Sequence, residues 1–83
     1  MPHPPLEMLK WSEMSIQDIL ELAIADEEEA RQYYLHAAGL AGNSHTRRVL
    51  LGLADMEQGH AETLRKELVD LQMQRDLETG MAD

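Results

Sequence analysis

The chain has 83 residues and carries 16 acidic side chains against 7 Lys and Arg, so its formal net charge is −9. This balance argues against nucleic acid or an anionic membrane as a partner, because both require a basic surface, but it suits the binding of cations. The absence of cysteine excludes disulfides, Cys-ligated zinc and iron–sulfur centres. No apolar run approaches the roughly 18 residues of a membrane span, and residues 1–10 lack a signal peptide's apolar core, so we expect a cytoplasmic protein.

Three segments are predicted along the chain. Residues 1–11 should form an extended, partly ordered N-terminal segment, because three prolines fall within the first five positions. Residues 12–76 should form the folded unit, and residues 77–83 a frayed C-terminal tail. Within the first segment, Leu6 to Lys10 can add a helical turn.

The first predicted helix runs from about Ile16 to about Ala41. Ser12 and Ser15 are both candidate N-caps, and Ser15 with Asp18 makes a capping box. The sequence Gly-Asn-Ser after Ala41 predicts the end of the helix, through a C-terminal glycine. Apolar residues recur every three or four positions, which is typical of a face packed on other helices. One charged residue interrupts this seam, which consists of Ile16, Leu20, Ala23, Glu27, Ala30, Tyr34, Ala37 and Ala41.

The second predicted helix begins near His45 or Thr46. Its seam consists of Thr46, Leu50, Leu53, Glu57, His60, Leu64, Glu67 and Leu71. Glu67 is expected to be exposed, because Leu68 beside it can continue the apolar seam. The pattern thins after Leu71, and Gly80 is predicted to stop the helix. Two helices joined by a short turn, with no strand pattern, predict an all-α, two-helix antiparallel hairpin.

Glu57 and His60 are three residues apart, so they share one face of the second helix. At a rise of 1.5 Å per residue, Glu27 lies roughly 20 Å before the turn and Glu57 roughly 20 Å after it, so the three side chains should meet. An unpaired carboxylate in an apolar seam is costly, and a metal cation can compensate it.

Di-iron four-helix bundles use one Glu from each of two helices and Glu-x-x-His from each of the other two. One chain supplies half of this set, so two chains supply all of it. The sequence therefore predicts a hairpin that dimerises into a four-helix bundle with a shared di-iron site. Carboxylate and imidazole ligands suit iron, with manganese as an alternative.

Simpler interpretations of the same residues stay open. Glu27 can instead form a surface ion pair with Arg31, and Asp26 to Glu29 can be a solvated acidic face. The whole chain can be a metal-free helical dimerisation module that uses the same seams. His36 and His45 lie off the seams and are expected at the surface.

A family resemblance rests on these motifs. Glu27-x-x-Ala30-x-x-x-Tyr34 followed by Glu57-x-x-His60 resembles the rubrerythrin-type branch of the ferritin-like superfamily. The 30-residue gap from Glu27 to Glu57, the half-length chain and the segment His3-x-Pro5-Leu6-Glu7-x-Leu9-Lys10 resemble the encapsulated ferritins. The resemblance covers roughly Leu6 to Leu71.

The resemblance implies a ferroxidase that oxidises Fe²⁺ with dioxygen or peroxide at a site between two chains, in support of iron storage or detoxification. It implies Glu27, Glu57 and His60 as iron ligands and Tyr34 as a neighbour of the site. It also implies an outer site through which metal enters, formed by Asp26, Glu29 and Tyr33. Dimers of that family assemble into rings, and an encapsulin shell is a further implied partner and location.

The chain departs from that family in three respects. Tyr33 stands where the family has Trp, and residues 79–83 do not resemble a shell-docking peptide. Rubrerythrins proper carry a Cys-ligated rubredoxin centre, and these 83 residues contain no cysteine. A rubrerythrin-like peroxidase activity would therefore need an external electron donor.

Overall fold

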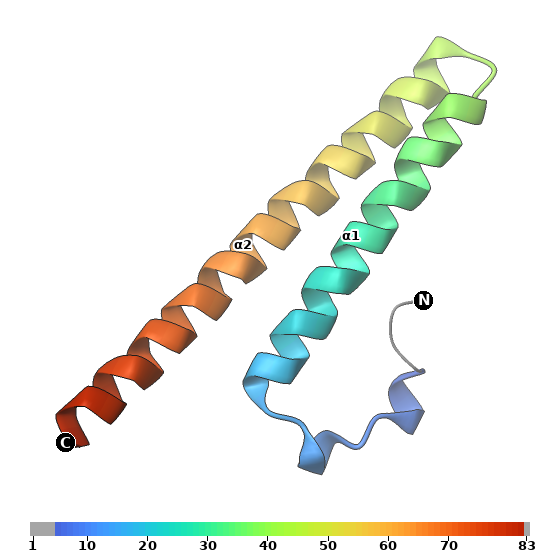
Figure 1. Cartoon of the computed structure of the whole chain (residues 1–83). Helices are drawn as coiled ribbons and strands as arrows, with labels where there is room; N and C mark the ends of the chain where they lie inside the picture. Colours follow the sequence, from blue (N-terminus) through green and yellow to red (C-terminus); the bar gives the residue numbers. More distant parts are fainter. Residues whose placement is uncertain (1–4, 83) are drawn as a thin grey trace.

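The chain folds as a helical hairpin (Figure 1). The computed structural model describes the backbone of residues 5–82 and the side chains of residues 5–78. Two short 3₁₀ turns, Leu6–Met8 and Trp11–Glu13, precede helix α1 (Ile16–Leu40) and helix α2 (Ser44–Ala82), and the described residues form no strand. The predicted all-α hairpin is thereby confirmed. Neither helix, within the described part, combines the length and the apolar run needed to cross a bilayer.

The N-termini of both helices are closed by side chains. Ser15 Oγ accepts a hydrogen bond from the Asp18 amide, and Asp18 Oδ2 accepts one from the Ser15 amide, both at 3.0 Å. This is the predicted capping box. Helix α2 begins at Ser44, slightly before the expected start, because Asn43 Oδ1 accepts a hydrogen bond of 2.8 Å from the Thr46 amide.

Glycines were predicted to end both helices, and the structure differs at both positions. No glycine among the described residues has a positive φ, and α1 ends in the extended residue Ala41. The Ala41 carbonyl accepts a hydrogen bond of 3.1 Å from Arg47, so a guanidinium takes the part expected of a glycine cap. Helix α2 continues through Gly80, since one glycine costs only about 1 kcal/mol in a helix. The division into residues 1–11, 12–76 and 77–83 stays a prediction, and His3 lies outside the described residues.

The contact between α1 and α2 is made by small residues. Ala38, Ala54 and Ala61 are 2–3% exposed and are the buried apolar residues of the described part. Each lies one position after a residue of the predicted seams, so the helices meet one residue away from those seams. The seam residues themselves are mostly half-buried. A helix in a bundle has more than one helical neighbour, and here the described residues supply each helix with a single one.

The hairpin is a single layer of helices. Its extents are 61 × 28 × 11 Å and its radius of gyration is 17.1 Å, against about 12 Å for a compact domain of this length. Its accessible surface is 6370 Å², whereas a compact monomer of 9.4 kDa exposes about 5000 Å². The excess is larger than the roughly 800 Å² that one partner contributes to a standard protein interface. We call the face that carries Leu53, His60 and Leu64 the seam side.

Candidate metal centre

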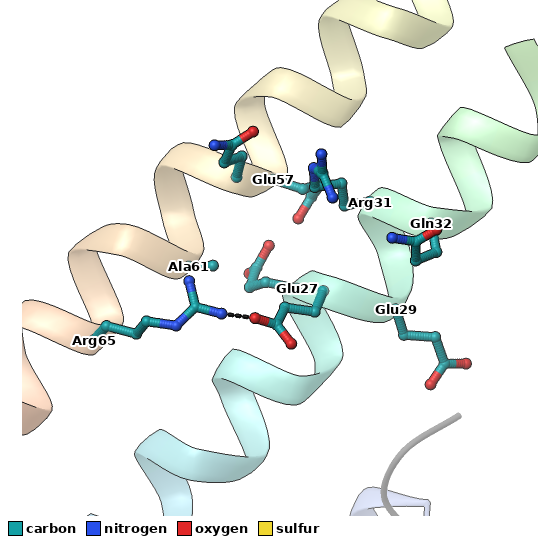
Figure 2. Close-up of a pocket in the computed structure, with 9 residues that line it drawn as sticks. Glu27, Glu29, Arg31, Gln32, Glu57, Ala61 and Arg65 are labelled. Carbon is teal, nitrogen blue, oxygen red and sulfur yellow. Dashed lines mark ion pairs between the residues drawn. The ribbon is translucent and has the colours of Figure 1, made fainter.

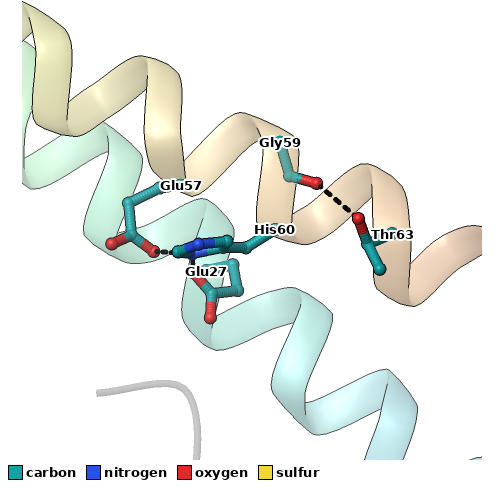
Figure 3. A network of polar contacts seen from close by, with 5 residues as sticks. All are labelled: Glu27, Glu57, Gly59, His60 and Thr63. Atoms are coloured by element: carbon teal, nitrogen blue, oxygen red, sulfur yellow. Dashed lines mark hydrogen bonds and ion pairs between the residues drawn. The ribbon is translucent and has the colours of Figure 1, made fainter.

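Three potential ligands converge midway along the hairpin (Figure 3). Glu27 comes from α1, whereas Glu57 and His60 come from one turn of α2. His60 Nδ1 lies 3.5 Å from Glu27 Oε2 and 3.8 Å from Glu57 Oε2. One ligand atom from each residue lies within 4.8 Å of the other two. The structure thus brings together the three residues that the sequence predicted as inner ligands.

The local helix geometry explains this convergence. Leu50, Glu57, Leu64 and Leu71 follow one another at intervals of seven residues, so Glu57 shares the half-buried stripe of these leucines. The stripe of Ala54, Ala61 and Leu68 beside it holds α1 close. The close approach at the alanines lets Glu27 reach across to α2.

Glu27 carries a polar atom that no hydrogen bond satisfies. Its Oε2 is buried and accepts no hydrogen bond from the described residues. The ion-pair contact with His60 at 3.5 Å is longer than an N–H···O hydrogen bond, so it does not replace one. A buried carboxylate oxygen without a donor is costly, and a cation beside it removes that cost. This atom, together with the neighbouring carboxylate and imidazole, fits a metal ion that prefers oxygen and nitrogen ligands.

The most exposed part of the centre lies on the seam side. The side chains of Glu27 and Glu57 are 27% and 20% exposed, whereas His60 is 56% exposed. Two carboxylates and one imidazole leave coordination positions of an iron ion unfilled, and a second copy of the same three residues would add further ligands. The half-open geometry therefore suits a site completed by another chain.

The residues implied as an outer site lie next to the inner ones. Asp26, Glu29 and Tyr33 line an open cavity of about 290 Å³ together with Ala30, Tyr34, Glu27 and Glu57. The rings of Tyr33 and Tyr34 meet edge to face with centroids 5.6 Å apart. Tyr34 is half-buried beside the carboxylates, whereas Tyr33 is exposed. The structure thus places the three outer residues and Tyr34 beside the predicted centre.

His36, His45 and Arg31 are not among the three residues that converge on the centre. His36 and His45 are exposed, as expected. Arg31, the alternative partner of Glu27, is half-buried and lines a second cavity that Glu27 also lines, described next.

A groove between the helices was not anticipated from the sequence (Figure 2). We call it the outer groove. It has a volume of about 510 Å³ and is lined by Glu27, Glu28, Glu29, Arg31, Gln32, Glu57, Gln58, Ala61 and Arg65. An ion pair between Arg65 of α2 and Glu28 of α1 crosses it. The sequence signal was the stripe Leu51, Gln58, Arg65 at intervals of seven, which changes from apolar to polar at the level of Glu57.

Comparison with known families identifies one match. The family model described as Rubrerythrin matches residues 18–82, which include every candidate ligand above. Comparisons with curated proteins and with solved structures yield no significant match. The matched segment spans more than half of the chain and nearly all of both helices.

Proposed function

Because the chain belongs to the rubrerythrin family, we propose that it is an iron-binding ferroxidase whose di-iron site forms between two copies. The family supports a ferritin-like, iron-binding role and an oxidoreductase activity. The proposal adds the reaction, oxidation of Fe²⁺ to Fe³⁺, and the dimeric four-helix bundle in which it takes place. Storage or detoxification of iron is the purpose that this reaction serves.

One observation carries the proposal. Glu27, Glu57 and His60 place ligand atoms within 4.8 Å of one another on a face that the described residues leave open. A two-fold dimer through the seam side would unite four carboxylates and two imidazoles. This is the ligand set of di-iron bundle proteins.

Each residue has a distinct part in the proposed reaction. Glu27 and Glu57 bind the Fe²⁺ substrate and neutralise the added charge of Fe³⁺, because anionic oxygen ligands favour the higher oxidation state. His60 binds iron through a ring nitrogen of the neutral imidazole. Tyr34 shapes the wall of the site beside the carboxylates. Two Fe²⁺ each lose one electron, so dioxygen with two protons yields hydrogen peroxide, or peroxide with two protons yields two waters.

The outer residues extend the proposal to iron uptake. Asp26 and Glu29 line the cavity that adjoins Glu27 and Glu57, with Tyr33 beside them. They would hold Fe²⁺ weakly on its way to the inner site. Assembly of dimers into rings, and a cytoplasmic location inside an encapsulin shell, complete the proposal and rest on the family resemblance of the sequence.

The test combines metal content, oligomeric state and activity of the full chain. We expect light scattering to report a dimer or larger assembly, and metal analysis to report about one iron per chain. Fe²⁺ added under air should be oxidised faster than in buffer, as followed by Fe³⁺ absorbance. A compact monomer that binds no iron would contradict the proposal and favour the metal-free module. Peroxide reduction that requires an added electron donor would identify a peroxidase instead.

A further inference from the structure

The outer groove and the seam side lie on different faces of the hairpin. At 3.6 residues per turn, Arg65 lies about 140° around α2 from His60. Gln58, seven residues before Arg65, shares its stripe and also lines the groove. A partner chain on the seam side would therefore leave the outer groove open to solvent.

The groove is also lined by two of the three candidate metal ligands. Glu27 and Glu57 belong to its lining as well as to the cavity beside Tyr34. Four carboxylates and two guanidiniums line the groove, so acidic groups outnumber basic ones. A concave acidic surface on a chain of net charge −9 raises the local concentration of cations.

The barrier across the groove is a weak one. The Arg65 and Glu28 side chains are each about half exposed, and exposed ion pairs contribute little stability. Solvent and salt compete with such a pair, so it opens readily. When it opens, the Glu28 carboxylate becomes available one residue away from Glu27.

We propose that the outer groove is an access route for divalent cations, in which Glu28 accepts the incoming ion and Arg65 competes with it. This inference rests on the proposed function, because the ions that pass reach the Glu27 and Glu57 ligands. The groove differs from the cavity beside Tyr34, because Asp26 and Tyr33 line that cavity and not the groove, whereas Glu29 lines both. Arg65 then acts as a gate that sets the rate of uptake and leaves the bound state unchanged.

The experiment measures binding of Co²⁺, which is taken up by the same ligand types and needs no oxidation for its detection. Stopped-flow absorbance gives the association rate constant of the full-length protein at low and at high salt. Arg65→Gln should raise this constant at least threefold, because it frees Glu28 and removes a positive charge. Glu28→Gln should lower it at least threefold. Both effects should shrink at high salt, and the number of Co²⁺ bound per chain should stay constant.

Two matched controls change the same charges outside the groove. Arg48→Gln and Glu78→Gln alter exposed residues about 20 Å or more along α2 from Arg65. Each should shift the rate constant less than twofold. The inference is overturned if Arg65→Gln and Glu28→Gln behave like these controls. It is also overturned if Asp26→Asn slows uptake while the two groove variants leave the rate constant unchanged. A wild-type chain that binds no Co²⁺ would overturn the proposed function and this inference with it, whereas normal binding at unchanged rates overturns the inference alone.

Discussion

The seam side and the outer groove differ in polarity, although the same two helices form both. The seam side carries half-buried Leu53 and Leu64 beside the half-open ligand His60. The outer groove carries Gln58, Arg65 and Glu28, which water solvates well. An apolar side without a cover calls for a partner, whereas a polar side does not. The carboxylates of Glu27 and Glu57 lie between the two, within reach of both.

The largest expected effect is the loss of metal from the seam side. Replacing Glu27, Glu57 or His60 with Ala should abolish stoichiometric iron binding and the oxidation of Fe²⁺. His36→Ala and His45→Ala are the controls and should retain both, because these side chains are exposed away from the centre. Metal analysis after gel filtration reports the result. Full metal content in Glu27→Ala would show that this carboxylate is not a ligand.

The Glu27→Ala substitution should also change the unfolding free energy of the apo protein. The apo protein should become more stable, because the substitution removes a buried carboxylate oxygen without a hydrogen-bond partner. Urea unfolding at fixed protein concentration measures the change. A less stable apo variant would mean that the carboxylate contributes packing or a polar contact that outweighs its burial.

A charge on each side tests which side faces a partner. Leu53→Glu should weaken dimerisation about 100-fold, equivalent to about 2.7 kcal/mol, because it buries a carboxylate in the proposed interface. Leu51→Glu is the matched control, since Leu51 belongs to the stripe of Gln58 and Arg65 and is already 41% exposed. Sedimentation equilibrium measures both dissociation constants. Equal weakening by the two variants would remove the distinction between the sides.

The alanine contact that separates the two sides should tolerate no larger side chain. Ala61→Leu should cost about 1–3 kcal/mol of unfolding free energy, because Ala61 is 2% exposed between the helices. Gly59→Ala in the same turn is its control. Among the described residues, a Cβ there would point into open space beside the helix, so the variant should gain about 0.5–1 kcal/mol in helix stability. Stabilisation by Ala61→Leu would mean that the helices separate without cost.

The smallest effect is expected in the outer groove. The double variant Glu28→Gln/Arg65→Gln should change the unfolding free energy by less than about 1 kcal/mol, because both partners are about half exposed. Urea unfolding again provides the measurement. A loss of several kcal/mol would make the ion pair a structural clamp, which contradicts its part as a gate that opens readily.

The sequence alone was sufficient for the two helices and for the level of the site, although not for the two helix ends at which a glycine was predicted to act. Ser15 with Asp18 marked the start of α1, and Asn43 lay within the predicted turn, because capping involves residues only a few positions apart. The position of Glu27 relative to Glu57 followed from the rise per residue and the position of the turn. These quantities depend on local geometry, which neighbouring residues determine.

Only the tertiary structure decided how the helices are rotated against each other. The seam pattern allowed contact through its own residues, yet the helices meet at Ala38, Ala54 and Ala61, one position away. That rotation turns His60 toward the open side and places Arg65 across the groove from Glu28. A broad apolar stripe is compatible with several rotations, and the choice among them depends on how closely the backbones approach. Small side chains on both helices permit the closest approach here, and no periodicity within either helix contains that information.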